Sequence, residues 1–431
     1  MTAIVCNCAY NGLSIIQELG RNNIDVHAVD SFPNIGTTSK YATYHKCPNP
    51  TTDEPEFVDY LIDLAAEFDD NPVIIPANDH WASAIANNLD RLSAHSTPCV
   101  ADAPTVDLLL NKRAFGEWAN DRSYPVPRTW RQDEVTDIPD NSFPIAAKPG
   151  DARHVPDMMF RSRLITFWNR LTGTSSNPSS TSDEKMRRKS ELYTDFRLKI
   201  FNNLGELQSF IDTYPDLTSK FTFQEYVRGM SDSMYTVGVY ANDGIVKGVF
   251  TGRKVRGYPP DIGDCKVGQV ESVPDRLVEV AKSICDELNY TGIAEFEYKK
   301  DTKTGDFYLI EINPRSWSWI GITPACGVNL PLMAYLDLSK SGDVSYLENK
   351  VPDGSVKWIK ATEDFLNVLI FYRQTHDEWA NGVLGWKSDI DGRKTVFAEG
   401  KLNDPLPICY SGILIIRRLM NMVKKSLHSK N

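Results

Sequence analysis

The feature that most constrains the fold is the regular alternation of strand-like and helix-like segments in the first hundred residues. Apolar runs at 2–6, 24–30 and 73–76 predict strands, and residues 12–19, 57–68 and 80–92 have the apolar spacing of helices. Strands that alternate with helices form parallel sheets flanked by those helices. We therefore expect an α/β, Rossmann-like domain over residues 1–104.

The turn after the first strand argues against a dinucleotide site. The run Cys6-Asn-Cys8-Ala-Tyr-Asn-Gly12 has one glycine, where the dinucleotide fingerprint needs three to let the backbone approach a pyrophosphate. Asp30 ends the second predicted strand, at a position where such folds hold a ribose. We interpret it instead as a loop carboxylate.

Composition excludes several classes of protein. A net charge of −10 argues against general nucleic-acid binding, which needs a basic footprint. The apolar runs are too short to span a membrane, and the N-terminus lacks the pattern of a signal peptide. The eight cysteines are dispersed and form no C-x-x-C pair, which indicates free thiols in a reducing compartment. We expect a cytoplasmic protein.

Residues 105–221 form a second predicted part with an unusual insertion. A helix at 106–120 carries Lys112, a strand at 143–148 ends in Lys-Pro-Gly, and ordered structure resumes at 200–214. The segment 151–195 between them is rich in Ser and Thr and then basic, a composition that cannot bury enough apolar surface to order itself. It is predicted to be a mobile insertion or lid.

Residues 222–340 form a third part with strand-like patterns, and residues 341–431 read as a small α-rich extension. Antiparallel strands are expected at 221–227, 234–240, 245–253, 294–299 and 307–312, with a helix at 274–288. The chain ends in SGILIIRRLMNMVKKSLHSKN, which has five Lys or Arg and no acid. Two interpretations of this basic helix stay open: docking on its own domain, or peripheral contact with an anionic membrane.

The third part contains the most informative side chains. In Glu295-Phe-Glu297-Tyr the two carboxylates project from one face of a strand, because side chains alternate along it. A neighbouring antiparallel strand would bring Glu311 beside Glu297, with Asn313 further along the same face. Two close carboxylates repel unless a cation lies between them, and Mg²⁺ prefers such oxygen ligands. The alternative is an exposed hairpin whose carboxylates face water.

The ordered string Glu311-Ile-Asn-Pro-Arg315 resembles the metal-binding signature of the ATP-grasp superfamily. Within that superfamily the chain resembles the carboxylate–amine ligases that include D-aspartate ligase. The resemblance covers essentially the whole chain: a pre-ATP-grasp domain, two ATP-grasp subdomains and an extension. It implies that ATP, with Mg²⁺ or Mn²⁺, activates a small-molecule carboxylate as an acyl phosphate, which an amine then attacks.

The resemblance also implies roles for individual residues. Glu297, Glu311 and Asn313 would hold the metal, with Glu295 competing for the place of Glu297, and Arg315 would steady the transferred phosphate. The residues expected to bind ATP are Lys112, Lys148 and Lys199 at the phosphates, the hinge Gln224-Glu225-Tyr226-Val227 at adenine, and Asp232 at the ribose. Arg253 and Lys254 are expected to meet the acyl phosphate or the substrate carboxylate.

One departure from the family and several alternatives remain. Many ATP-grasp enzymes have a glycine-rich loop after the Lys-Pro strand, whereas this chain has Gly150-Asp-Ala-Arg-His154 and the insertion. A biotin-carboxylase-type enzyme would need a biotin-bearing partner, since no Met-Lys-Met is present, and a regulatory ATP-binding protein is a third interpretation. Trp317 and Trp319 are equally interpretable as pocket lining or core. Homodimers are common in the family.

Overall fold

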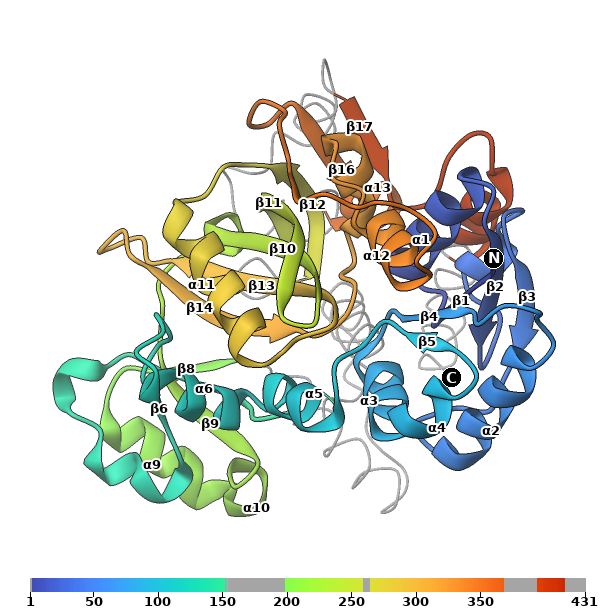
Figure 1. The fold of residues 1–431 in the computed structure, drawn as a ribbon. Coiled ribbons are helices and arrows are strands. Elements are labelled where there is room, and N and C mark those ends of the chain that lie inside the picture. The colour runs from blue at the N-terminus through green and yellow to red at the C-terminus, as the bar shows by residue number, and fades with distance from the viewer. Residues whose placement is uncertain (1, 152, 154–197, 259–263, 368–393, 415–431) are drawn as a thin grey trace, which may run out of the picture. The chain divides into compact units, whose positions relative to one another are not determined.

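The computed structural model describes residues 2–151, 153, 198–258, 264–367 and 394–414 (Figure 1). Contacts divide the chain into two compact units. The large unit combines Met1–Leu110 with Val227–Ser411, and the small unit is built mainly from Asn111–Tyr226. Most of the predicted insertion and of the basic tail lies outside the described residues, so those two predictions are not tested.

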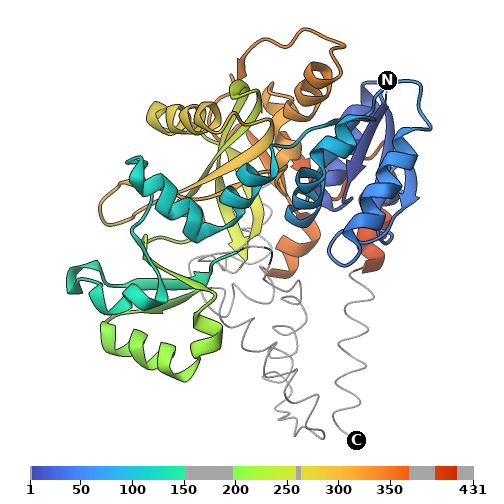
Figure 2. The ribbon, with the colours of Figure 1, turned by 60° about the horizontal axis from the view of Figure 1, so that its bottom comes forward.

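The first hundred residues form the expected parallel sheet. Its strand order is β3-β2-β1-β4-β5, and every neighbouring pair is parallel. Figure 2 shows the blue strands of this sheet between flanking helices. The elements are β1 (Thr2–Cys6), α1 (Tyr10–Arg21), β2 (Asp25–Asp30), β3 (Thr43–Lys46), α2 (Glu54–Ala65), β4 (Val73–Pro76), α3 (Asp79–Asn87), α4 (Leu89–Ser93), β5 (Thr97–Pro98) and α5 (Ala103–Leu110).

Two helices expected from the sequence are each divided by an asparagine. The helix predicted at 80–92 is interrupted at Asn88, and the helix predicted at 106–120 ends at Leu110 and begins again at Lys112. Asn111 has an extended backbone, and its side chain accepts a hydrogen bond from the backbone N–H of Ala114. An asparagine in this conformation caps a new helix, so the apolar spacing alone could not reveal the break.

The rest of the large unit is an eight-stranded, mostly antiparallel sheet. Its order is β14-β13-β10-β11-β12-β16-β17, with the short β15 beside β11. The strands predicted at 234–240, 245–253, 294–299 and 307–312 are present, whereas the strand predicted at 221–227 belongs to the sheet of the small unit. β12, β15, β16 and β17 were not expected, and the last three show that residues after 340 also contribute strands to this sheet. The elements are β10 (Met234–Asn242), β11 (Ile245–Tyr258), β12 (Asp264–Val270), α11 (Asp275–Glu287), β13 (Gly292–Lys300), β14 (Phe307–Asn313), α12 (Leu330–Leu338), β15 (Leu347–Glu348), β16 (Val356–Ile359), α13 (Ala361–Asn367) and β17 (Lys394–Phe397).

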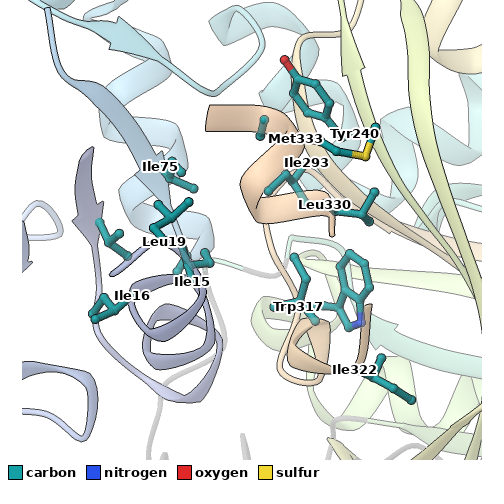
Figure 3. Packing of buried hydrophobic residues seen from close by; sticks show 14 of the residues in the cluster. Ile15, Ile16, Leu19, Ile75, Tyr240, Ile293, Trp317, Ile322, Leu330 and Met333 are labelled. Atoms are coloured by element: carbon teal, nitrogen blue, oxygen red, sulfur yellow. The ribbon is translucent and has the colours of Figure 1, made fainter. Parts of the chain in front are cut away.

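One hydrophobic core joins the two sheets of the large unit (Figure 3). Ile15 and Leu19 of α1 belong to the same buried cluster as Leu330 and Met333 of α12. Trp317, which follows the Asn-Pro-Arg string, lies in it too and is 1% exposed. The apolar face of α1, predicted from its spacing, is therefore covered by residues that lie three hundred positions later in the chain.

The small unit has its own sheet and a small core. Its strand order is β6-β9-β7-β8, and all pairs are antiparallel. Phe210 of the helix α9 packs against Phe201 and Phe221 of the sheet. The elements are α6 (Lys112–Asp121), β6 (Thr129–Trp130), β7 (Ile145–Pro149), β8 (Lys199–Phe201), α9 (Leu204–Thr213), α10 (Pro215–Thr218) and β9 (Phe221–Glu225).

Two general expectations can be compared with the whole described chain. All eight cysteines are free, and only Cys409 is exposed. Among the helices of the described residues, none has the length and apolar character needed to span a membrane.

Candidate functional site

The strands β13 and β14 bring the predicted carboxylates together. Their antiparallel register places Glu297 opposite Glu311 and Glu295 opposite Asn313. Residues opposite one another in such a pair share a face of the sheet, and so do residues two apart on one strand. The four side chains therefore lie on one face, as the sequence pattern predicts.

Lys254 forms an ion pair with Glu297 on this face. Its ammonium group lies 3.0 Å from Oε1 and 3.1 Å from Oε2 of Glu297, and its side chain is 8% exposed. Burial alone would lower the pKa of Lys254, but the carboxylates of Glu297 and Glu295 outweigh this effect and raise it. Lys254 is therefore a fixed cation beside Glu297, a contact that the sequence pattern did not predict.

Glu295 is buried, and within the described residues the hydrogen bonds that its carboxyl group accepts come from neutral groups. Its Oε1 accepts a hydrogen bond from the hydroxyl of Thr236 at 3.0 Å, and its Oε2 accepts one from the amide of Asn313 at 3.0 Å. Burial, and then the charge of Glu297, raise the pKa of Glu295 to about 8, although Lys254 acts in the opposite direction. The site thus contains excess negative charge that a bound cation would offset.

Arg315 is held by an aspartate that the sequence reasoning missed. Its Nε donates to Oδ1 of Asp79 at 2.9 Å, its Nη2 donates to Oδ1 of Asn313 at 3.1 Å, and its Nη1 donates to the carbonyl oxygen of Ser316. Asp79 is the first residue of α3, at the carboxyl end of β4. Polar residues at that edge of a parallel sheet are candidates for function, which is the signal that could have identified it.

Two glycines let the chain after the motif lie against the sheet. A Cβ on Gly238 would come within 2.2 Å of the Trp317 ring, and one on Gly268 within 2.5 Å of the Trp319 ring. Both tryptophans are 1% exposed and contact Phe250. Of the two interpretations of these tryptophans, the core is therefore correct, and their packing fixes the course of residues 314–319.

Arg253 lies on the other face of β11 from Lys254, since neighbouring residues of a strand alternate. Its Nη1 donates to the carbonyl oxygen of Asp232 at 3.2 Å, and its Nε lies 3.9 Å from Glu271. The structure thus joins Arg253 to the predicted ribose residue Asp232, and does not bring it to the carboxylates of β13 and β14. Val227, the last hinge residue, begins the second segment of the large unit and is buried.

In the small unit the register of β7 separates the predicted ATP residues by face. Lys148 is opposite Thr222, and Gln224, two positions further, shares their face, where its amide donates to the Thr129 hydroxyl at 2.9 Å. Lys199 is opposite Ala147 and thus lies on the other face, with its ammonium group 4.4 Å from the centroid of the Phe210 ring. The structure does not bring Lys199 together with Lys148.

The remaining small-unit candidates lie at the ends of these strands. The backbone N–H of Lys112 donates to the carbonyl oxygen of Gly150, which joins the start of α6 to the end of β7. A pocket of about 230 Å³ opens beside this contact, lined by Asn111, Arg113, Gly150, Asp151, Ser219, Lys220, Phe221 and Thr222. The hinge residues Glu225 and Tyr226 donate backbone hydrogen bonds to the carbonyl oxygens of Arg128 and Pro144.

The oxygen atoms on the β13–β14 face fit a hard cation that also binds phosphate. The described residues contain no group of three or more His, Cys, Asp or Glu side chains suited to holding a metal ion by themselves. Mg²⁺ does not require such a group, because it commonly binds one or two carboxylates and completes its shell with water and substrate phosphates. Two carboxylates with the amide oxygen of Asn313 match that requirement.

The chain is similar in sequence to a known ligase. No protein-family model matches the chain. A D-aspartate ligase of Enterococcus faecium is 22% identical over 295 residues, which are 64% of this chain and 62% of that protein. The chain thus spans less than two thirds of the length of this relative.

Solved structures share the fold at low sequence identity. An L-amino acid ligase from Bacillus licheniformis superimposes with a TM-score of 0.54 at 13% identity, covering 79% of this chain and 74% of that one. A biotin carboxylase from Campylobacter jejuni gives 0.57 at 12% identity, covering 80% and 72%. An N5-carboxyaminoimidazole synthetase from Staphylococcus aureus gives 0.54 at 13%, covering 80% and 78%. The chain therefore shares the fold of these ligases and carboxylases, and its sequence is similar to that of a D-aspartate ligase.

Proposed function

We propose that the chain is an ATP- and Mg²⁺-dependent ligase that activates a carboxylate as an acyl phosphate and couples it to an amine. The observation that carries the proposal is the β13–β14 face, where Glu295, Glu297, Glu311 and Asn313 lie together beside Lys254. Such a set of charges suits phosphoryl transfer, in which catalysis is mostly positioning and charge neutralisation. The similarity to a D-aspartate ligase supports an amide-forming reaction over other uses of the fold.

The contacts support Glu295, rather than Glu297, as the carboxylate that joins Glu311 and Asn313 at the metal. Glu297 already has a counter-charge, because Lys254 contacts both of its oxygen atoms. In the part of the chain that the structure describes, Glu295 accepts hydrogen bonds from neutral donors, one of which is the Asn313 amide. A buried carboxylate without a paired cation is costly, so it gains most from a bound metal. A bound metal would neutralise part of the negative charge of the phosphate.

The other residues have roles that follow from their chemistry. Lys254 would contribute a second fixed cation for the acyl phosphate, and Arg315 a planar donor for its oxygen atoms. In the small unit, Lys148 and Gln224 share a face and would contact ATP, with Lys112 at the start of α6. None of these steps requires a nucleophilic side chain, because the amine substrate attacks the acyl phosphate directly.

The experiment is to measure phosphate release from ATP and Mg²⁺ against a panel of D- and L-amino acids and small acids. We expect release that needs both an acid and an amine, a product with their condensed mass, and loss of both signals in Glu311→Ala. ADP formation with bicarbonate alone would support a carboxylase, the alternative that the biotin carboxylase fold raises. ATP binding without turnover on any pair would support a regulatory protein.

A further inference from the structure

Asp79 lies near the point where the strand order of the parallel sheet reverses, between β1 and β4. In the order β3-β2-β1-β4-β5, the chain leaves β1 toward one edge and β4 toward the other, and ligands of such sheets bind at the carboxyl ends of these two strands. In this protein, the segment that follows β14 lies at that place. The amide of Asn11, in α1, donates to the carbonyl oxygens of Ala77, at 2.6 Å, and Ser316, at 3.1 Å.

The guanidinium of Arg315 is oriented chiefly by Asp79. The carboxylate accepts from Nε at 2.9 Å and from Nη2 at 3.4 Å, which is the forked geometry of an arginine–carboxylate pair. Both side chains are 18% exposed. Burial alone would lower the pKa of Arg315, but Asp79, and then Glu295, outweigh it and raise the pKa. Arg315 is therefore a permanent cation whose plane is fixed.

The hydrogen bonds continue from Arg315 to the metal carboxylate. Nη2 of Arg315 donates to Oδ1 of Asn313, and the amide of Asn313 donates to Glu295. Arginine only donates, so the oxygen of the Asn313 amide faces Arg315 and its nitrogen is left to donate to Glu295. The orientation of the metal-binding amide thus depends on the orientation of Arg315.

We propose that Asp79 is a positioning residue that sets the direction in which Arg315 and Asn313 face the transferred phosphate. Asp79 accepts hydrogen bonds from Nε and Nη2 of Arg315. The amide oxygen of Asn313 accepts a second bond from Nη2, and the carbonyl oxygen of Ser316 accepts one from Nη1. Among the described residues these contacts leave one N–H of Nη1 unused, and an anionic phosphate oxygen would accept a hydrogen bond from it. The inference rests on the proposed function, and adds that the N-terminal parallel sheet, not the ATP-grasp strands, orients the phosphate-binding arginine.

The test compares Asp79→Asn, Arg315→Lys and the double variant in the intact protein. Asparagine keeps the shape of Asp79 but presents an amide to Nη2, and lysine cannot form the fork. For Asp79→Asn we expect kcat for ATP-dependent phosphate release to fall about 10–100-fold, the usual cost of losing a partner that orients a ligating group, while the KM for ATP stays within about 3-fold. The double variant should fall no further than Arg315→Lys alone.

Asp337→Asn is the matched control, because Asp337 is also a half-buried carboxylate paired with a cation, Lys247, at 2.6 Å. It should lower Tm at least as much as Asp79→Asn and leave kcat within about 2-fold. Losses that multiply in the double variant would overturn the proposal, since Asp79 would then act independently of Arg315. An Asp79→Asn protein with lowered Tm and unchanged kcat would also overturn it.

A second measurement separates this inference from the proposed function. If wild type turns over no substrate pair, the failure belongs to the proposed function. The affinity of each protein for Mg²⁺ with a non-hydrolysable ATP analogue then tests Asp79. We expect Asp79→Asn, Arg315→Lys and the double variant to weaken analogue binding by the same factor, about 2–3-fold, and to leave ADP binding unchanged. Independent factors, or no effect of Asp79→Asn, would overturn the inference.

Discussion

The carboxylate face of the large unit and the lysine face of the small unit differ in how their functional residues are held. On β13 and β14, candidate residues hydrogen-bond one another, as Asn313 does with both Glu295 and Arg315. In the small unit, the predicted phosphate lysines are divided between opposite faces of one sheet, with Lys148 on one and Lys199 on the other. The carboxylate face is thus held by contacts among its own side chains, whereas in the small unit the strand register separates the predicted phosphate lysines.

The largest expected effect sharpens the assignment within the carboxylate face. We expect Glu295→Gln to lower the rate of ATP-dependent phosphate release about 1,000-fold and to raise the Mg²⁺ concentration needed, since a metal ligand is lost. Glu297→Gln should lower the same rate about 10-fold, because Lys254 would lose the carboxylate that holds it. Phosphate release measured over a range of Mg²⁺ concentrations checks both. The reverse order would identify Glu297 as the ligand and break the argument from its paired charge.

The second prediction asks whether buried charges also stabilise the large unit. Glu363 accepts from Lys266 at 2.7 Å and lies 3.0 Å from Lys360. Burial would raise the pKa of Glu363, but Lys360 and Lys266 outweigh it and lower the pKa from 4.5 to about 2. The stabilisation is therefore complete above about pH 4.5 and disappears as the pH falls through about 2.

Accordingly, Glu363→Gln should lower the free energy of unfolding by about 3 kcal/mol at pH 6, and the difference from wild type should shrink toward pH 2. Urea unfolding across this range checks the prediction. The control is Glu279→Gln, which breaks an exposed pair with Lys282 and should cost less than about 0.5 kcal/mol. A difference that does not depend on pH would show that the ion pair is not responsible.

The third prediction compares close packing in the two units. Gly238→Ala places a methyl group 2.2 Å from the Trp317 ring, so we expect it to destabilise the large unit by about 2 kcal/mol. Gly116→Ala in α6 meets the Thr129 side chain, whose nearest atom is the hydroxyl oxygen at 3.1 Å, and gains helix propensity, so its effect should stay within about 1 kcal/mol. Denaturant unfolding of both variants checks this. Equal losses would contradict the difference between the units.

The smallest expected effect concerns the lysines of the small unit. Lys148→Met should weaken ATP binding about 10-fold, which is about 1.4 kcal/mol, through loss of one phosphate contact. Lys199→Met should leave binding within about 2-fold, because Lys199 lies over Phe210 on the opposite face. Calorimetric titration with Mg²⁺ and ATP checks both. Equal losses would show that the two faces do not differ in nucleotide contact.

Period-two alternation and a short connection explain why the carboxylate face could be predicted. These two local features fix the face of Glu297 and its register with Glu311. The contact between Lys254 and Glu297 depends on strand order, since β10 lies between their strands, and no local pattern carries that order. The pair of Asp79 and Arg315 joins residues 236 positions apart, so it was missed entirely.

The same limit explains the errors in the fold. The parallel sheet was predictable because each strand and helix has a strong periodic pattern of its own. The division of one predicted helix at Asn111 depends on a cap, and the face of Lys199 depends on a strand register across a long insertion. The helix break depends on a single residue and the face of Lys199 on a distant pairing, and the spacing of apolar residues contains information on neither.

The shared core of the large unit has a consequence for synthesis on the ribosome. The side chains of Ile15 and Leu19 can be covered only after Leu330 and Met333 emerge, and the segment Asn111–Tyr226 of the small unit is translated before them. At about 5–20 residues per second, that delay is roughly 15–60 s, during which the nascent parallel sheet exposes an apolar helix face. Arrested chains with residues 1–110 outside the ribosome should be cut rapidly by protease, and those with residues 1–411 should resist. Early resistance would show that the N-terminal sheet folds alone.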